Sequence, residues 1–115
     1  NLSRALGDLE YKKDRTLGPE KQIISATPDV RVEPRSDEDE FVLVCCDGVW
    51  DVKTNQEAVD FVRARISRDP FANPGDIEAA LEALLDDCLS PDLRLTKGLG
   101  GDNMTAVCCR LPSAK

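Results

Sequence analysis

The feature that most constrains this 115-residue chain is an unbroken apolar run, Phe41–Cys46 (FVLVCC), which Asp47-Gly48 stops abruptly. Six apolar residues rich in β-branched side chains favour a strand over a helix. A strand without polar alternation is typical of one that is covered on both faces. The sequence therefore predicts a buried central strand with an acidic turn at its end.

Two amphipathic helices are predicted after this strand. The first begins near Thr54, which stands three residues before Glu57 as in a capping box, and ends at Arg68-Asp69-Pro70. The second runs from about Pro74 to Leu89, with Asn73 as its cap and Pro74 as its first residue. Apolar residues recur at helical spacing in both: Ala58, Val59, Val62 and Ile66, then Ile77, Ala80, Leu81, Leu84, Leu85 and Cys88.

Further strands are expected on both sides of these helices. Ile23-Ile24 and the alternating Val30 and Val32 suggest two short strands separated by Pro28, and Met104–Leu111 suggests a last one. Strands, a strand, two helices and a strand in this order predict an α+β fold with helices laid over one sheet face.

Composition narrows the function classes. A formal net charge of −7 argues against nucleic-acid binding, and no stretch has the length of a membrane span. The five cysteines include no C-x-x-C pair, and the chain has no histidine, which argues against a zinc site. Free thiols are favoured over disulfides, which predicts an intracellular protein, cytoplasmic or nuclear.

Three carboxylates flank the predicted strands. Asp47 follows the first apolar run with Asp51 one helical turn later, and Asp102 precedes the last run behind Gly100-Gly101. If the two strands are neighbours, these carboxylates gather at one spot, where two of them about 4 Å apart repel by roughly 4 kcal/mol. A divalent cation would remove that cost, and oxygen-only ligands favour Mg²⁺ or Mn²⁺. The alternative is that Asp47 and Asp102 are ordinary turn residues.

Other polar residues have weaker claims to a site. Asp8, after Gly7, is a ligand candidate whose simpler role is to stabilise a turn, and Arg4 could meet phosphate or cover apolar surface. Gly98–Gly101 lacks the spacing of a phosphate loop and precedes a strand, so we discount that interpretation. The acidic stretch Asp37–Glu40 is typical of a solvated turn.

Taken together, three segments resemble the PPM (type 2C) protein phosphatases, and the resemblance extends from Leu2 to Leu111. The segments are Ser3–Asp8 (SRALGD) with Tyr11-Lys12, the apolar run leading into Asp47–Asp51 (DGVWD), and Gly101–Met104 (GDNM). The resemblance implies a metal-dependent hydrolase, a serine/threonine phosphatase acting on phosphoproteins.

The resemblance also implies a role for each matching residue. Asp47 and Asp102 match carboxylates that ligate a two-metal Mg²⁺ or Mn²⁺ centre, and Asp51 with Asp47 matches a third, weaker site. Asn103, Asp8 and Gly48 match positions that support the centre without ligating metal. Trp50 is expected to pack. Metal-activated water attacks phosphorus in this chemistry, so no cysteine nucleophile is required, and no Cys-x5-Arg pattern occurs.

The family fold is a four-layer αββα sandwich, and this chain matches its C-terminal half only. Nothing matches the family's bridging Asp, its phosphate-gripping Arg or its His acid. We therefore expect residues 1–115 to be the C-terminal part of one catalytic domain, inactive alone and prone to self-association through exposed sheet faces. The alternative is a non-catalytic regulatory or binding module of the same family.

Two departures from the family pattern stand out. Gly101 occupies a position where many relatives carry an Arg, and Pro91–Gly100 is longer than the usual connection. The longer connection is a candidate contact for a substrate or partner.

Overall fold

A computed structural model of the chain describes residues 2–69, 73 and 75–112. The chain divides into two compact units, residues 1–34 and 35–115, and each is described here by itself. No helix within the described residues is long and apolar enough to cross a membrane.

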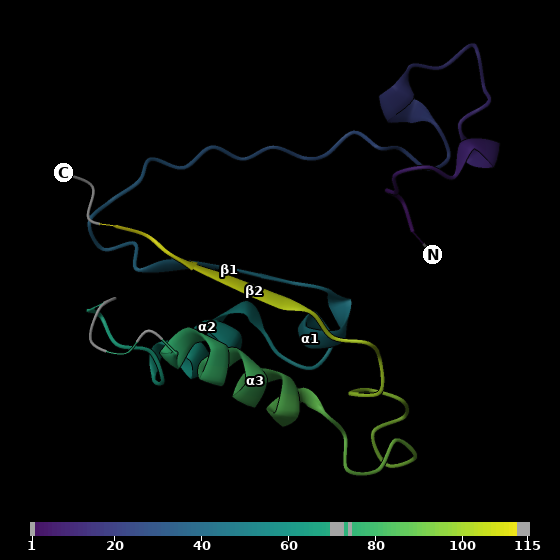
Figure 1. Ribbon diagram of the computed structural model, residues 1–115. Helices are drawn as coiled ribbons and strands as arrows, with labels where there is room; N and C mark the ends of the chain where they lie inside the picture. The colour runs from purple at the N-terminus through teal and green to yellow at the C-terminus, as the bar shows by residue number, and fades with distance from the viewer. Residues whose placement is uncertain (1, 70–72, 74, 113–115) are drawn as a thin grey trace. The chain divides into compact units, whose positions relative to one another are not determined.

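The larger unit is built on two antiparallel strands, β1 (Phe41–Cys45) and β2 (Ala106–Arg110). Their register pairs Phe41 with Arg110 and Cys45 with Ala106. Figure 1 shows the two strands running side by side although about 60 residues of chain separate them. Both predicted strands at these positions are confirmed, each one or two residues shorter at its ends.

Three helices accompany the sheet: α1 (Asp47–Trp50), α2 (Asn55–Arg63) and α3 (Asp76–Cys88). Figure 1 shows α2 and α3 on the same face of the two strands, which confirms the predicted α+β arrangement. The capping box is confirmed: Thr54 Oγ1 accepts from the Glu57 amide at 3.3 Å, and the Thr54 amide donates to Glu57 Oε2 at 2.8 Å. However, α2 ends at Arg63, earlier than predicted.

The start predicted for the second helix was early. Gly75 is the N-cap of α3, and the carbonyl of Asn73 accepts from the Asp76 amide at 3.2 Å, so Asn73 is not the cap. The predicted first residue, Pro74, lies outside the described residues. The bond between the Asp76 amide and the Asn73 carbonyl closes a turn before the helix ladder begins.

The core lies between the helices and the inner face of the sheet. Val49, Ala58, Val62, Leu84 and Cys88 are its buried members, with Leu43, Trp50, Leu81, Leu85 and Cys108 among those packed against them. This confirms the predicted apolar faces of both helices. The expectation of a strand covered on both faces was wrong: Val42 and Val44 are 47% and 60% exposed, because helices cover only one face in the described unit.

The smaller unit has little regular structure. It contains two 3-10 helices, η1 (Leu9–Tyr11) and η2 (Pro19–Lys21), and one bridge between Arg4 and Ser25. The strands predicted around Ile23 and Val30–Val32 are wrong for the described residues, where Val30 and Val32 are 79% and 87% exposed. Alternation makes a strand only when the backbone finds a partner, and Val30 and Val32 pair with no strand among the described residues.

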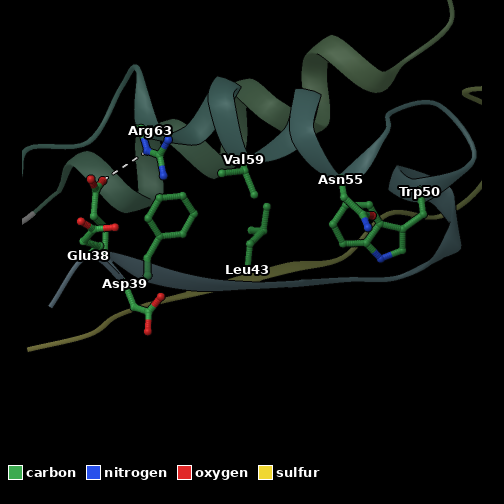
Figure 2. A pocket seen from close by; sticks show the side chains of 9 residues that line it. Glu38, Asp39, Leu43, Trp50, Asn55, Val59 and Arg63 are labelled. Carbon is green, nitrogen blue, oxygen red and sulfur yellow. Dashed lines mark ion pairs between the residues drawn. The ribbon is translucent and has the colours of Figure 1, made fainter. Parts of the chain in front are cut away.

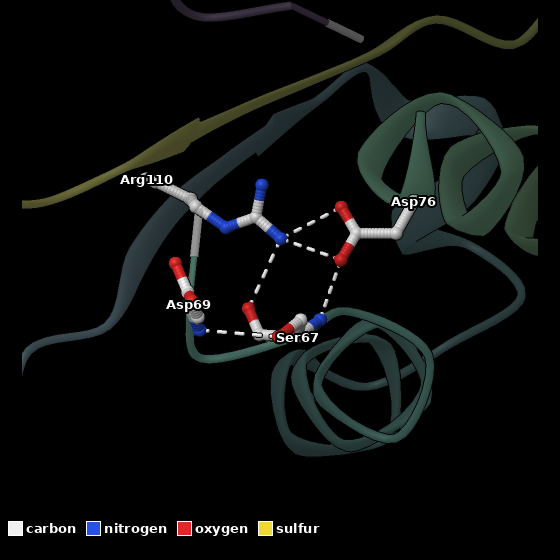
Figure 3. Close-up of polar contacts among 4 residues, drawn as sticks. All are labelled: Ser67, Asp69, Asp76 and Arg110. Carbon is white, nitrogen blue, oxygen red and sulfur yellow. Dashed lines mark hydrogen bonds and ion pairs between the residues drawn. The ribbon is translucent and has the colours of Figure 1, made fainter. Parts of the chain in front are cut away.

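A buried ion pair fastens the larger unit together. One guanidinium nitrogen of Arg110 at the end of β2 lies 2.6 Å from both carboxylate oxygens of Asp76, and it also donates to the Ser67 carbonyl at 3.0 Å (Figure 3). The Ser67 amide donates to Asp76 at 2.5 Å. Asp76 therefore joins the start of α3, the segment after α2 and the end of β2.

This network predicts how stability depends on pH. The hydrogen bond from Arg110, and then the one from the Ser67 amide, lower the pKa of Asp76 below its ordinary 3.8. A lowered pKa means stabilisation that is present above 3.8 and lost as pH falls through the folded value. We expect Asp76→Asn to destabilise the protein at neutral pH and its deficit to shrink as the pH falls from neutral to below 3.8.

Urea unfolding of both proteins across that pH range measures the effect. The Asn variant is the reference that removes the contribution of all other carboxylates. A deficit that stayed constant with pH would contradict the ion-pair account.

Candidate metal centre at the end of the sheet

The antiparallel pairing of β1 with β2 brings two acidic turns to one end of the sheet. Beyond the last strand pair, the Cys46 amide donates to the Thr105 carbonyl at 3.1 Å. Asp47 is the residue after Cys46, and Asp102 lies three residues before Thr105. The condition set by the sequence, that the two strands be neighbours, is met.

The short helix α1 carries the first pair of carboxylates. Asp47 is its first residue, and Asp51 follows its last residue, with the Asp51 amide donating to the Asp47 carbonyl at 2.8 Å. Residues four apart lie on the same side of a helical turn, so both carboxylates project from one side of α1. Both residues are exposed, so a cation from solvent can reach their carboxylates.

Gly48 lets the two turns touch. It is buried, and a methyl group in place of its hydrogen would stand 2.4 Å from the carbonyl oxygen of Asn103. The side chain of Met104 would lie 3.1 Å from the same methyl. A larger residue at position 48 therefore cannot fit unless the Asp102 loop moves away.

The loop that carries Asp102 is anchored to the end of α3. Gly100 has φ +78° and accepts from the Ser90 amide at 3.1 Å, and a methyl group on it would stand 2.5 Å from the Cys88 carbonyl. The Asn103 amide donates to Asp102 Oδ1 at 2.7 Å. Asn103 thus contacts the Asp102 side chain through its main-chain amide, and this bond uses only one of the two carboxylate oxygens.

Trp50 packs as the sequence suggested. It is partly buried against the core, and its indole N–H donates to the Cys45 carbonyl at 2.8 Å. This bond closes α1 back onto the end of β1 and helps to fix the orientation of the turn that carries Asp47.

Asp8 and Arg4 belong to the smaller unit, so their relation to the carboxylates remains a prediction. Asp8 has φ +49° at the start of η1, and its carbonyl accepts from the Tyr11 amide at 3.0 Å, which is the turn role considered for it. Arg4 is engaged within its own unit: it lies 2.8 Å from Asp29 and donates to the Thr27 carbonyl at 3.0 Å.

The donor chemistry suits a hard cation, but the ligand set is not complete. Asp47, Asp51 and Asp102 offer only oxygens, which Mg²⁺ and Mn²⁺ prefer. Across residues 2–69, 73 and 75–112, no group of three or more His, Cys, Asp or Glu side chains comes together in a way that could hold a metal ion. The metal-ligand roles of these three aspartates therefore stay predictions.

A cavity of about 360 Å³ lies elsewhere, between β1 and α2. In Figure 2, Leu43 and Val59 project toward each other inside it, with Glu38 and Arg63 at one end and Asp39 pointing away from Arg63. Arg63 is paired with Glu40 at 3.3 Å. None of the three candidate ligands lines this cavity.

Cys46 is a residue of this region that the sequence analysis did not single out. Its thiol lies 3.4 Å from the Asn103 carbonyl and 3.2 Å from the Thr105 amide nitrogen. Its place at the end of an apolar run suggested only a packing residue. The one available signal was its position immediately before the Asp-Gly turn.

The contact at Gly48 generates a direct prediction. Gly48→Ala should lower the free energy of unfolding by about 1–3 kcal/mol, because the added methyl overpacks the contact with Asn103. Gly75→Ala is the comparison variant: Gly75 is exposed, and no atom of the described residues lies within 4 Å of an added methyl there. Equal stability of the two variants in urea unfolding would show that the two turns are not in close contact.

Comparisons with known proteins identify the family of this chain. A family model described as Protein phosphatase 2C matches residues 1–94. Human Protein phosphatase 1G is 46% identical over 108 residues, which are 93% of this chain and 20% of that protein. Protein phosphatase 2C homolog 3 of Schizosaccharomyces pombe is 49% identical over 107 residues, or 93% of this chain and 24% of that protein.

A plant relative gives the same result. Probable protein phosphatase 2C 11 of Oryza sativa subsp. japonica is 42% identical over 107 residues, which are 93% of this chain and 28% of that protein. The chain thus spans between a fifth and somewhat over a quarter of the length of these relatives. Since the family model covers residues 1–94 of 115, this chain belongs to the protein phosphatase 2C family.

Proposed function

We propose that this chain is the C-terminal part of the catalytic domain of a serine/threonine protein phosphatase, whose whole protein hydrolyses phosphoserine and phosphothreonine on proteins. The observation that carries the proposal is the contact between the turns of Asp47 and Asp102 at the end of β1 and β2. In a member of this family, we expect a phosphate-binding centre to be built around two acidic turns that are in contact.

Asp47 and Asp102 would hold a two-metal centre of Mg²⁺ or Mn²⁺, and Asp51 with Asp47 a third, weaker ion. Such ions, when bound, lower the pKa of water and offset charge on the phosphate. The chain's own contribution is geometric: its main-chain contacts at Gly48 and Cys46 fix the spacing between the carboxylate-bearing turns. An acidic protein of net charge −7 needs local cations, either Arg or Lys side chains or bound metal, to bind a phosphate ester.

The proposal includes inactivity of this chain by itself. The three carboxylates do not form a complete ligand group in the described residues, and the sequence contains no histidine to serve as an acid. The chain also spans only 20% of human Protein phosphatase 1G. We infer that the remaining ligand, an Arg for the phosphate and the acid come from other parts of the whole protein.

A non-catalytic module is the second candidate. One observation favours it: the outer face of the sheet exposes Val42, Val44 and Val107, a surface suited to binding another protein segment. The presence of Asp47, Asp51 and Asp102 favours the enzyme, since a purely structural module has no need of all three carboxylates.

The exposed face predicts how the isolated chain behaves. Because β1 has an unpaired edge and the three valines face solvent, we expect the isolated chain to associate with itself at micromolar concentration. Sizing with light scattering measures the mass. A mass of 12.6 kDa, that of one chain, would contradict this expectation.

The function is tested by Mn²⁺-dependent hydrolysis of a phosphothreonine peptide. We expect activity in the whole protein and none in this chain. In the whole protein, Asp47→Asn and Asp102→Asn should each lower activity at least about a hundred-fold, because losing even a residue that only orients a metal ligand costs about 10–100-fold in metal affinity or activity. Asp86→Asn, an exposed aspartate on α3, is the matched control and should keep full activity.

Two outcomes would contradict the proposal. An inactive whole protein would favour the binding module, and capture of a partner through the exposed valines would be the next step. Normal activity of this chain alone would show that the centre is complete without other segments.

A further inference from the structure

The thiol of Cys46 bridges the two acidic turns. Its S–H donates to the Asn103 carbonyl, with sulfur and oxygen 3.4 Å apart, and its sulfur accepts from the Thr105 amide at 3.2 Å. The Cys46 amide adds a third bond, to the Thr105 carbonyl at 3.1 Å. One residue therefore makes three hydrogen bonds to a segment 57 to 59 residues away in sequence.

These bonds lie where the regular ladder has stopped. The last paired residues of the strands are Cys45 and Ala106, and within the described residues no strand pairing continues beyond them. Asp47 follows Cys46 in one segment, and Asp102 precedes Asn103 in the other. The thiol thus lies directly between the main-chain segments that carry the two candidate ligands.

We infer that Cys46 is a positioning residue for the metal centre, and this inference rests on the proposed function. Its thiol holds the Asp102 loop at a fixed offset from α1. The protein therefore does not have to bring the Asp47 and Asp102 carboxylates together when a cation binds. The role involves no covalent chemistry at sulfur. The thiol acts as a hydrogen-bond donor and a hydrogen-bond acceptor at the same time, and an apolar side chain can do neither.

The other four thiols do not have this arrangement. Cys45, Cys88 and Cys108 are inward-facing, and burial is the main cause that raises the pKa of each. Cys109 is exposed, and its sulfur contacts the carbonyl of its own neighbour Arg110 at 3.5 Å. Cys109 is therefore a matched control: its thiol is on the same strand pair and, among the described residues, bonds to no distant segment.

The character of the bonds decides what a substitution should change. Thiols are weak donors and acceptors, so losing them should alter the stability of the protein little. Misplacing a ligand, by contrast, is costly, because partners that orient metal ligands are worth about 10–100-fold in metal affinity. A positioning role therefore predicts a large change in metal binding with a small change in unfolding.

The test uses Cys46→Ala, Cys46→Ser and Cys109→Ala in the whole protein. Mn²⁺ binding is measured by calorimetry, and exchange of the Thr105 amide hydrogen is measured without metal. We expect Cys46→Ala to bind Mn²⁺ about ten-fold more weakly and to lose protection at Thr105. Cys46→Ser keeps a donor and an acceptor and should recover most of both, and Cys109→Ala should match the unsubstituted protein.

The outcomes separate the two claims. If the unsubstituted protein binds no Mn²⁺, the proposed function fails, and the positioning role fails with it. If it binds Mn²⁺ and Cys46→Ala binds equally well, only the positioning role is overturned. If Cys46→Ser binds as weakly as Cys46→Ala, the thiol fills space rather than donating and accepting, which also overturns it.

Discussion

The pairing of β1 with β2 is the constraint on which the larger unit depends. It joins segments about 60 residues apart, from Phe41 with Arg110 to Cys45 with Ala106. The pairing creates the inner face on which α2 and α3 pack, and it brings the end of one strand beside the start of the other. The core and the candidate metal centre are therefore consequences of one register, and a slip by one residue would move every side chain to the opposite face.

The same sheet explains why the larger unit has its core on one face of the sheet only. Leu43 and Cys108 pack inward against the core, while Val42, Val44 and Val107 face outward. A small unit of this kind has a core on one face only, and its second face is apolar as well. In the proposed function that face belongs to the interior of a larger catalytic domain, which agrees with a chain that spans 20% of human Protein phosphatase 1G.

Local signals in the sequence predicted local structure well. The capping box at Thr54 and Glu57 needs only residues three apart, and the apolar run gave β1 almost to the residue. The neighbouring positions of the Asp47 and Asp102 turns followed from the sequence only on the condition that their two strands pair, and the pairing of β1 with β2 meets that condition.

What could not be predicted depends on distant partners. Val30 and Val32 alternate like a strand but find no pairing segment in the described residues. The Asp76–Arg110 pair and the Cys46 contacts join residues 34 to 59 apart, which no local pattern encodes.

The most direct test of the central claim is Mn²⁺ titration of the whole protein, followed by paramagnetic broadening of the amide signals of Gly48 and Asn103. If the two turns share one centre, both signals should broaden at the same low Mn²⁺ concentration, and Asp47→Asn should abolish both effects together. Broadening at the acidic turn Asp37–Glu40 without any at Gly48 and Asn103 would contradict the account.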